Sequence, residues 1–306
     1  MNHQGGKSEN PRRRPWGKDA ARGAPRRGFG SRGESPARDA RETHRDAPAS
    51  DRGWDAVASW YDKLVGEQGS DYHRHVIIPA VMEMLALRSG EVVLDLCCGQ
   101  GVMVRPLIAA GAGRITGVDA SPKLIAAARK RYALDGGAEF LVADATRPGP
   151  WTNGTFDAAV CVLAVHDVAD MEALFRQLGA ALKPGGRAVL VVMHPCFRIP
   201  RQSHWGWDEE RKIQFRRLDC YQSPIAIPIT THPGRGGAEQ TLFHHRSLEA
   251  YLNALGQAGL GVTGASELAT HRRSQPGPRS RGEHRAAREF PVFLALKVTS
   301  LRARGK

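Results

Sequence analysis

The sequence lacks several features that define other classes of protein. No run of about 18 apolar residues is present, which argues against a transmembrane helix. The N-terminus is polar and basic, without the apolar core of a secretory signal. The five cysteines include no CxxC pair, which argues against a disulfide framework and against a structural zinc site. We therefore expect a cytoplasmic protein with reduced thiols, no membrane partner and no metal site.

Acidic residues are scarce in the segments that carry most of the positive charge. The formal net charge is +13. Residues 1–53 contain 13 Lys and Arg against seven Asp and Glu, and residues 271–288 contain six Arg against one Glu. Residues 297–306 contain four cations and no acid. The basic character therefore belongs to the ends of the chain and one loop, while the body is close to neutral.

The segment 1–53 differs in composition from the rest of the chain. It is rich in Arg, Gly and Pro and poor in apolar side chains, so we expect disorder. Arg-Gly pieces with scattered aromatic residues are typical of weak RNA binding, and a solvated tail without a partner is the alternative. We expect one catalytic domain at 54–300 with an insert at 194–245, followed by a basic tail at 301–306.

The most informative segment is 92–101, which reads VVLDLCCGQG. A short apolar strand ends in Asp95, and a tight turn with Gly99 and Gly101 leads into a helix. Glycines at such a turn let the backbone approach a ligand closely. The spacing matches neither the dinucleotide fingerprint nor the phosphate loop, which indicates a different ligand.

Two further predicted strands also end in acids. Asp119 ends ITGVD about one βαβ step later, where its carboxylate can accept hydrogen bonds from two ribose hydroxyls. Ser121 and Pro122 then begin a helix as N-cap and first-turn residue. Asp144 follows the third strand in FLVADAT.

The rest of the chain continues the alternation of strands and helices. Near-continuous apolar strands separated by helices predict a buried parallel sheet. We expect no regular structure at 194–210. The expected elements are two helices within 54–87, strands at 156–162 and 187–193, a helix at 171–182 ended by KPGG, strand-like segments at 211–231, a helix at 247–258 and a last strand at 290–298.

These landmarks together resemble the class I S-adenosylmethionine (SAM)-dependent methyltransferases. VVLDLCCGQG is similar to motif I of that family, except that Cys97 stands where the first glycine often is. VDASPKLIAAARKR, FLVADAT, FDAAVCVLAVHDV and LKPGGRAVLVV follow in the family's order. The resemblance covers roughly residues 54–298. It implies an α/β fold with a Rossmann-like, doubly wound, seven-stranded sheet, and SAM as cofactor.

The resemblance also implies which residues contact the cofactor. Asp119 would meet the ribose, and Asp144 with its neighbour would meet the adenine. Tyr61 in ASWYD is similar to a tyrosine near the methionine end in related enzymes, and a core aromatic is its alternative role. The implied contacts are Tyr61, Asp95, Cys97, Gly99, Gly101, Asp119, Ala120, Asp144, Ala145 and Leu163.

Two histidines are candidate catalytic residues. His166 follows the fourth strand and His194 ends the fifth, and a neutral imidazole can accept a proton from an N–H or O–H nucleophile. The alternative role of each is to order its loop. Trp205, Trp207 and Tyr221 are candidates for an aromatic wall around a planar or cationic acceptor, or for anchors of a lid.

We expect transfer of a methyl group from SAM to an oxygen, nitrogen or carbon atom of a small molecule. The near-neutral body and the aromatic insert favour this function. A second hypothesis is an RNA methyltransferase that uses 1–53 and 271–288, although no NPPY-type tetrapeptide follows the fourth strand. A third is a SAM-binding regulator without activity. No pattern in the sequence assigns an oligomeric state.

Overall fold

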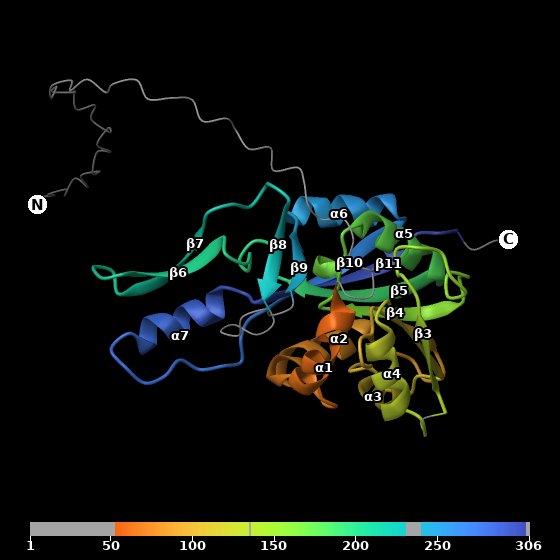
Figure 1. Cartoon of the computed structure of the whole chain (residues 1–306). Helices are drawn as coiled ribbons and strands as arrows, with labels where there is room; N and C mark the ends of the chain where they lie inside the picture. The colour runs from red at the N-terminus through yellow and green to blue at the C-terminus, as the bar shows by residue number, and fades with distance from the viewer. Residues whose placement is uncertain (1–52, 135, 231–239, 304–306) are drawn as a thin grey trace, which may run out of the picture. The chain divides into compact units, whose positions relative to one another are not determined.

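The computed structural model describes residues 53–134, 136–230 and 240–303 (Figure 1). The predicted disorder of 1–53 falls, apart from Gly53, on residues outside this part of the chain. The end of the basic C-terminal tail, 304–306, lies outside it as well. None of the helices in the described ranges is both long and apolar enough to cross a membrane.

A seven-stranded sheet forms the centre of the fold, with the order β10-β11-β5-β4-β1-β2-β3. The first five strands in the sequence run parallel, and β11 and β10 add an antiparallel edge beyond β5. The chain builds outward from β1 to β3 and then returns to place β4 on the other side of β1. The strands are β1 (Val92–Leu96), β2 (Arg114–Asp119), β3 (Ala138–Val142), β4 (Phe156–Val162), β5 (Leu182–Met193), β10 (Leu260–Leu268) and β11 (Phe293–Ser300). The predicted Rossmann-like sheet is confirmed.

Helices cover both faces of this sheet (Figure 1). Val93 packs in the core beneath α2, α3 and α4, whereas Leu94 and Leu96 pack in the core beneath α5 and α6. Because successive side chains of a strand point to opposite faces, one apolar run supplies both cores. These helices are α2 (Ile78–Leu85), α3 (Val104–Ala109), α4 (Pro122–Arg131), α5 (Met171–Ala181) and α6 (Leu248–Gln257).

Side-chain caps fix the start of three of these helices. The Ser121 hydroxyl accepts the N–H of Leu124 at the start of α4, as its place before Pro122 predicts. Asp170 and Ser247 accept N–H groups in the same way at the starts of α5 and α6. Each cap satisfies a backbone donor that the helix itself leaves unpaired.

Two helical elements precede the first strand. They are α1 (Trp54–Val65) and a π-helical turn, η2 (His73–Ile77), that continues into α2. Gly53 precedes α1, and the two segments agree with the helices that the sequence predicts before the first strand. Single π-turns of this kind are frequent at functional sites.

The insert after β5 differs from the sequence-based expectation. Residues 194–210, predicted to be irregular, contain β6 (Ser203–Asp208), which pairs with β7 (Ile213–Leu218). β8 (Ile225–Thr230) pairs with β9 (Gln240–His245), and the second of these was not predicted. No residue of β6 is fully buried, so SHWGWD carries only the two tryptophans as an apolar signal, and the strand is stabilised by pairing with β7 and by contact with α7.

A helix within the arginine-rich segment was also missed. In α7 (Ser280–Glu289) only Gly282 and Ala286 are buried, so the sequence carries no apolar stripe. The helix packs instead on the β6–β7 hairpin through Gly282. A Cβ atom at this position would lie 2.7 Å from Cζ3 of Trp207 and 2.8 Å from the carbonyl oxygen of Lys212. The absence of a side chain at Gly282 therefore permits the contact.

Candidate active site

A cavity of about 700 Å³ lies at the carboxyl ends of the parallel strands, bounded by the loops after β1, β2, β3 and β4 and by α1. This is the edge of an open α/β sheet at which ligands collect. Of the ten residues predicted to contact the cofactor, those that line it are Tyr61, Asp95, Cys97, Gly99, Asp119, Ala120, Asp144, Ala145 and Leu163. Gly101 does not line the cavity.

Asp95 occupies the end of β1 with an unpaired carboxylate. The residue is 2% exposed, and its Oδ2 atom has no hydrogen-bond partner among the described residues. Burial, and the neighbouring negative charge of Asp119, raise the pKa of Asp95 to about 8. A buried carboxylate oxygen without a partner is costly, so a cationic group in the cavity would stabilise the ionised form.

The Asp119 carboxylate organises the turn of motif I. Its Oδ2 accepts the N–H of Gly99 at 2.9 Å, and its Oδ1 accepts the N–H of Ser121 at 2.9 Å. Burial raises the pKa of Asp119, and these two hydrogen bonds oppose the rise. Each oxygen keeps a further lone pair, so the carboxylate can also accept hydrogen bonds from two hydroxyl groups of a ligand.

Two non-glycine residues beside the cavity have a backbone conformation in the left-handed region. Cys97 has φ 57°, and Leu163, after β4, has φ 55°. Cys97 therefore adopts the conformation for which glycine is usually selected. Such backbone costs about 1–3 kcal/mol and collects at functional sites.

The third acidic position is more exposed. The Asp144 Oδ1 atom accepts the N–H of Thr146 at 2.9 Å and the hydroxyl of the same residue at 2.7 Å. Its Oδ2 atom lies 3.4 Å from Nε of Arg147. The carboxylate is thus fixed in orientation while remaining open to the cavity and to solvent.

Helix α1 is tied over the cavity by two contacts that sequence reasoning did not foresee. The Asp55 carboxylate accepts the Ser121 hydroxyl at 2.8 Å and the N–H of Lys123 at 3.0 Å. Asp62 accepts Arg131 at 2.6 Å. Both contacts join α1 to α4, whose N-cap is Ser121, so the helix that carries Tyr61 is held at the rim of the cavity.

Comparisons with known proteins agree with this geometry. A family described as a methyltransferase domain matches residues 93–186. The 2-phytyl-1,4-naphtoquinone methyltransferase of Synechococcus elongatus is 30% identical over 225 residues, which are 71% of this chain and 88% of that protein. The chain belongs to the SAM-dependent methyltransferases.

Two further comparisons place this methyltransferase among its relatives. The crystal structure of a SAM-dependent methyltransferase from Mesorhizobium loti is 30% identical, with a TM-score of 0.56, and the match covers 72% of this chain and 96% of that one. The ubiquinone biosynthesis O-methyltransferase of Xanthomonas axonopodis pv. citri is 28% identical over 158 residues, which are 50% of this chain and 61% of that protein.

The cavity of the methyltransferase fits its cofactor. SAM presents a cationic ammonium and a sulfonium at one end and the two hydroxyls of a ribose at its centre. Asp95 offers an unpaired buried carboxylate oxygen, and Asp119 offers free lone pairs at the turn. When bound, SAM supplies a methyl group activated for in-line transfer, so that positioning and exclusion of water fall to the protein.

Neither predicted catalytic histidine lines the cavity of the methyltransferase. The N–H of Cys196 donates to Nδ1 of His194 at 3.2 Å, so the ring proton lies on Nε2, which donates to Glu267 at 2.9 Å. Both ring nitrogens are therefore engaged. Burial lowers the pKa of His194, opposed by Glu267. The ring connects the end of β5 to β10.

His166 is buried behind the cavity lining, with its Nε2 4.0 Å from Oδ2 of Asp167. Its ring packs on Phe243 of β9 with centroids 4.8 Å apart, and its Nδ1 has no hydrogen-bond partner within the described ranges. Burial, assisted by Arg246, lowers the pKa of His166 to about 3. An imidazole so placed stays neutral and buried, which suits the structural alternative.

The acid beside it was missed by the sequence analysis. Asp167 lines the cavity, and burial raises its pKa well above the usual value for an aspartate. Burial chiefly, and Asp167 next, raise the pKa of Tyr61, which faces the same space. The sequence signal was an acid in the loop after β4, five residues beyond Val162 in LAVHDV, but we assigned the role to the histidine before it.

The proposed aromatic wall is not assembled. Trp205 lines a separate cavity, and Trp207 packs between α7 and Arg279, whose guanidinium lies 5.1 Å from the ring centroid. The Tyr221 hydroxyl accepts the N–H of Leu248 at 3.0 Å. Two of the three side chains thus support the insert and α6.

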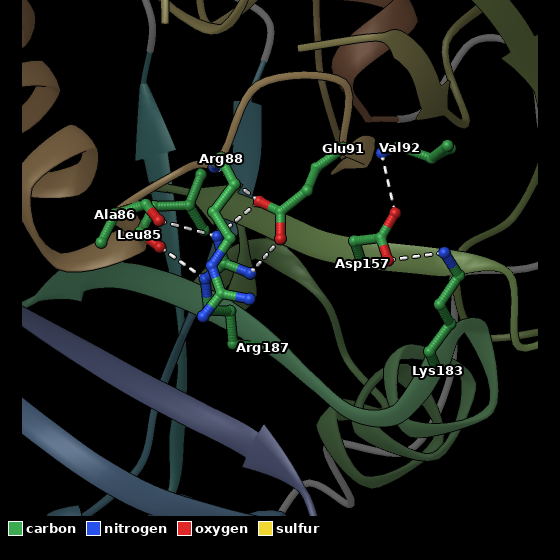
Figure 2. Close-up of polar contacts among 8 residues, drawn as sticks. All are labelled: Leu85, Ala86, Arg88, Glu91, Val92, Asp157, Lys183 and Arg187. Carbon is green, nitrogen blue, oxygen red and sulfur yellow. Dashed lines mark hydrogen bonds and ion pairs between the residues drawn. The ribbon is translucent and has the colours of Figure 1, made fainter. Parts of the chain in front are cut away.

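Paired charges lie at the amino ends of the parallel strands, opposite the cofactor cavity. Figure 2 shows Arg187 donating to the Leu85 and Ala86 carbonyl oxygens and to Glu91, at distances between 2.6 and 2.9 Å. Asp157 accepts the N–H of Val92 at 3.0 Å and also Lys183. Because these groups satisfy one another, we assign them to holding the strand starts together.

One cluster of metal-ligating side chains was not expected from the sequence. The ligand atoms of Asp71, His75 and His271 all lie within 4.8 Å of one another. Arg272 donates to Asp71 at 2.9 Å and neutralises its charge. The cluster joins the start of η2 to the segment after β10.

Proposed function

We propose that this methyltransferase acts on a small-molecule acceptor. One observation carries the proposal: the cofactor cavity is lined by six aspartates and by no lysine or arginine. The aspartates are Asp55, Asp95, Asp119, Asp144, Asp167 and Asp170. Such a lining attracts the cationic cofactor and repels a polyanion, which favours a small acceptor over RNA. The naphtoquinone and ubiquinone-pathway names of the relatives support the same proposal.

We assign the cofactor contacts as follows. Asp95 holds the cationic end of SAM, Asp119 holds the ribose hydroxyls, and Asp144 with Ala145 borders the adenine. The free carboxylate oxygen of Asp95 and the lone pairs of Asp119 support this orientation. The methyl group then lies toward Tyr61 and the loop after β4.

We assign Asp167 the role that the sequence suggested for the histidines. A hydroxyl or amine acceptor loses a proton as it is methylated, and Asp167 places a carboxyl in the cavity lining, with Nε2 of the neutral His166 4.0 Å from its Oδ2. A raised pKa makes the ionised carboxylate a stronger base and makes activity rise with pH. Tyr61, with its own raised pKa, remains a neutral hydrogen-bond donor beside it.

The test is transfer of label from labelled SAM into fractionated cell extract, with and without RNase. We expect the label in RNase-resistant small molecules, and Asp167→Asn to reduce the rate about 10²–10⁴-fold if it is a general base. Glu172→Gln, an exposed change on α5, is the matched control. Label that disappears with RNase would support the RNA hypothesis. SAM binding without label in any fraction would support the regulator.

A further inference from the structure

A second cavity of about 280 Å³ lies where the β6–β7 hairpin and α7 meet the start of β11. The hairpin and α7 lie side by side beyond the end of the sheet (Figure 1). Four arginines line this cavity, together with one carboxylate, Glu283: they are Arg198, Arg216, Arg272 and Arg273. We call this the arginine pocket. Its charge is opposite to that of the aspartate-lined cofactor cavity.

Two of these arginines already have partners. Arg216 donates to the Phe197 carbonyl oxygen at 2.8 Å and to the Ser203 hydroxyl at 2.6 Å. Arg272 forms an ion pair with Asp71 at 2.8 Å, and its guanidinium lies 4.9 Å from the ring centroid of Tyr72. These contacts fix the walls of the pocket.

The charges of the other two arginines, Arg198 and Arg273, are available to a ligand. Across the described ranges, no hydrogen bond or ion pair engages the guanidinium of Arg198 or Arg273. Burial, and then the charge of Arg198, lower the pKa of Arg216, which shows that like charges are close together. Guanidiniums that line one pocket, and that form no ion pair within the described ranges, can bind a carboxylate or a phosphate.

The pocket shares a wall with the cofactor cavity. Tyr72 lines the arginine pocket, and the next residue, His73, lines the cofactor cavity. The helical turn that carries these two residues therefore borders both spaces. Tyr72 is fixed there, because its hydroxyl lies 2.9 Å from that of Thr270 and its ring meets Phe293 edge-on at 5.4 Å.

Aromatic rings complete the lining. Phe290 meets both Phe197 and Trp205 edge-on, each with centroids 5.5 Å apart, and all three rings line the pocket. Arg216 lies 4.8 Å from the ring centroid of Trp205. This combination suits a planar, apolar group that carries a negative charge, rather than the cationic acceptor that the aromatic residues alone suggested.

We propose that the arginine pocket binds an oxyanion of the methyl acceptor, a carboxylate or a phosphate, while the reacting atom lies in the adjoining cofactor cavity. This inference rests on the proposed function. The opposite charges of the two cavities would orient the acceptor, because its anionic end is attracted by Arg198 and Arg273 and repelled by the aspartates.

Calorimetric titration of the full chain, saturated with S-adenosylhomocysteine, tests the pocket. The probes are benzoate, phenyl phosphate and the neutral benzamide, with inorganic phosphate to separate oxyanion binding from ring binding. We expect benzoate or phenyl phosphate to bind at least tenfold more tightly than benzamide, and the tighter of the two identifies the oxyanion. Arg198→Gln and Arg273→Gln should each weaken that probe about tenfold or more, whereas Arg285→Gln, on the exposed face of α7, should not.

The outcomes are separable. Equal binding of charged and neutral probes, or anion binding unaffected by Arg198→Gln and Arg273→Gln in folded protein, would overturn the proposal. A short RNA that displaces phenyl phosphate and depends on Arg285 would also overturn it, in favour of a nucleic-acid surface. Affinity for S-adenosylhomocysteine is measured in each variant. If a protein loses its affinity for S-adenosylhomocysteine but still binds the anionic probes, the result counts against the proposed function and not against the arginine pocket.

Discussion

Tyr132 lies directly over Gly101: its hydroxyl donates to the Gly101 carbonyl oxygen at 2.8 Å, and its Cε2 atom would lie 2.8 Å from a Cβ at that position. Gly99 differs, because a Cβ there would meet Tyr61 at an ordinary 3.7 Å, on the cavity side. Both glycines have positive φ. The two therefore serve different purposes, packing at Gly101 and access to the ligand at Gly99.

Alanine substitutions should separate these purposes. Gly101→Ala adds a clash to left-handed strain of about 1–2 kcal/mol, so we expect its Tm to fall by roughly 5 °C or more. Gly99→Ala should lower the Tm less and weaken SAM binding more. Thermal unfolding without ligand and calorimetry with SAM measure the two effects. Equal Tm losses in the two variants would contradict the assignment.

Asp119→Asn should weaken SAM binding by about 10–100-fold. The change removes charge from hydrogen bonds that are worth about 1.5–3 kcal/mol each, and it also presents a donor to the N–H of Gly99 or Ser121. Calorimetry gives the affinity, with Glu172→Gln as control. Unchanged affinity in a folded variant would refute the assignment to the ribose.

SAM binding near pH 7 should release protons through Asp95. The carboxyl has a pKa of about 8 in the ligand-free protein, so most molecules carry this proton at pH 7. A bound cation favours the ionised form, so affinity should rise between pH 6 and 8. Calorimetry in buffers of different ionisation enthalpy measures the release, at up to about 0.9 proton at pH 7. Asp95→Asn should abolish it, and release that persists in this variant would assign the proton elsewhere.

His166→Phe should improve stability at acidic pH and leave methyl transfer nearly unchanged. The folded-state pKa is about 3, below the unfolded value of about 6.5. The unfolded state therefore binds the proton first, and stability is lost as pH falls below 6.5, by up to about 1.4 kcal/mol per unit. Denaturant unfolding of both proteins from pH 7 to 4.5 measures the difference between their free energies of unfolding. Asp95 and Asp167, whose raised pKa values have the opposite effect on stability, are present in both proteins, so their contributions cancel in this difference. A parallel pH dependence would show that His166 is not buried as a neutral ring.

The central sheet and most of the cofactor cavity were predictable from local patterns. Apolar runs ending in Asp95, Asp119 and Asp144 give strands whose carboxyl ends meet at one edge, and that topology brings the acids together. The glycines and the N-cap Ser121 likewise act on neighbouring backbone. Spacing alone therefore located these residues.

The remainder depends on segments far apart in the sequence. The alignment of Asp55 with Ser121 requires the docking of α1 on α4. The ring of His166 packs on β9, whose sequence QTLFHH does not alternate clearly between apolar and polar residues. His194 contacts Glu267 of β10, on a strand far away in the sequence. Local patterns cannot indicate which distant group takes a side chain's hydrogen bonds, so Asp167 was passed over in favour of the histidines.

The contact of Gly282 with Trp207 limits how this enzyme's substrate range can be changed. Apart from Tyr72, the arginine pocket is built from two segments, 197–216 and 270–292, that are separated in the chain and meet at this contact. Grafting the hairpin of a relative alone would bring a foreign surface against α7, and grafting α7 alone would leave Trp207 facing an unmatched helix. A chimera with altered acceptor preference needs both segments from the same parent. In evolution, insertions or substitutions in the two segments are expected to be inherited as a pair.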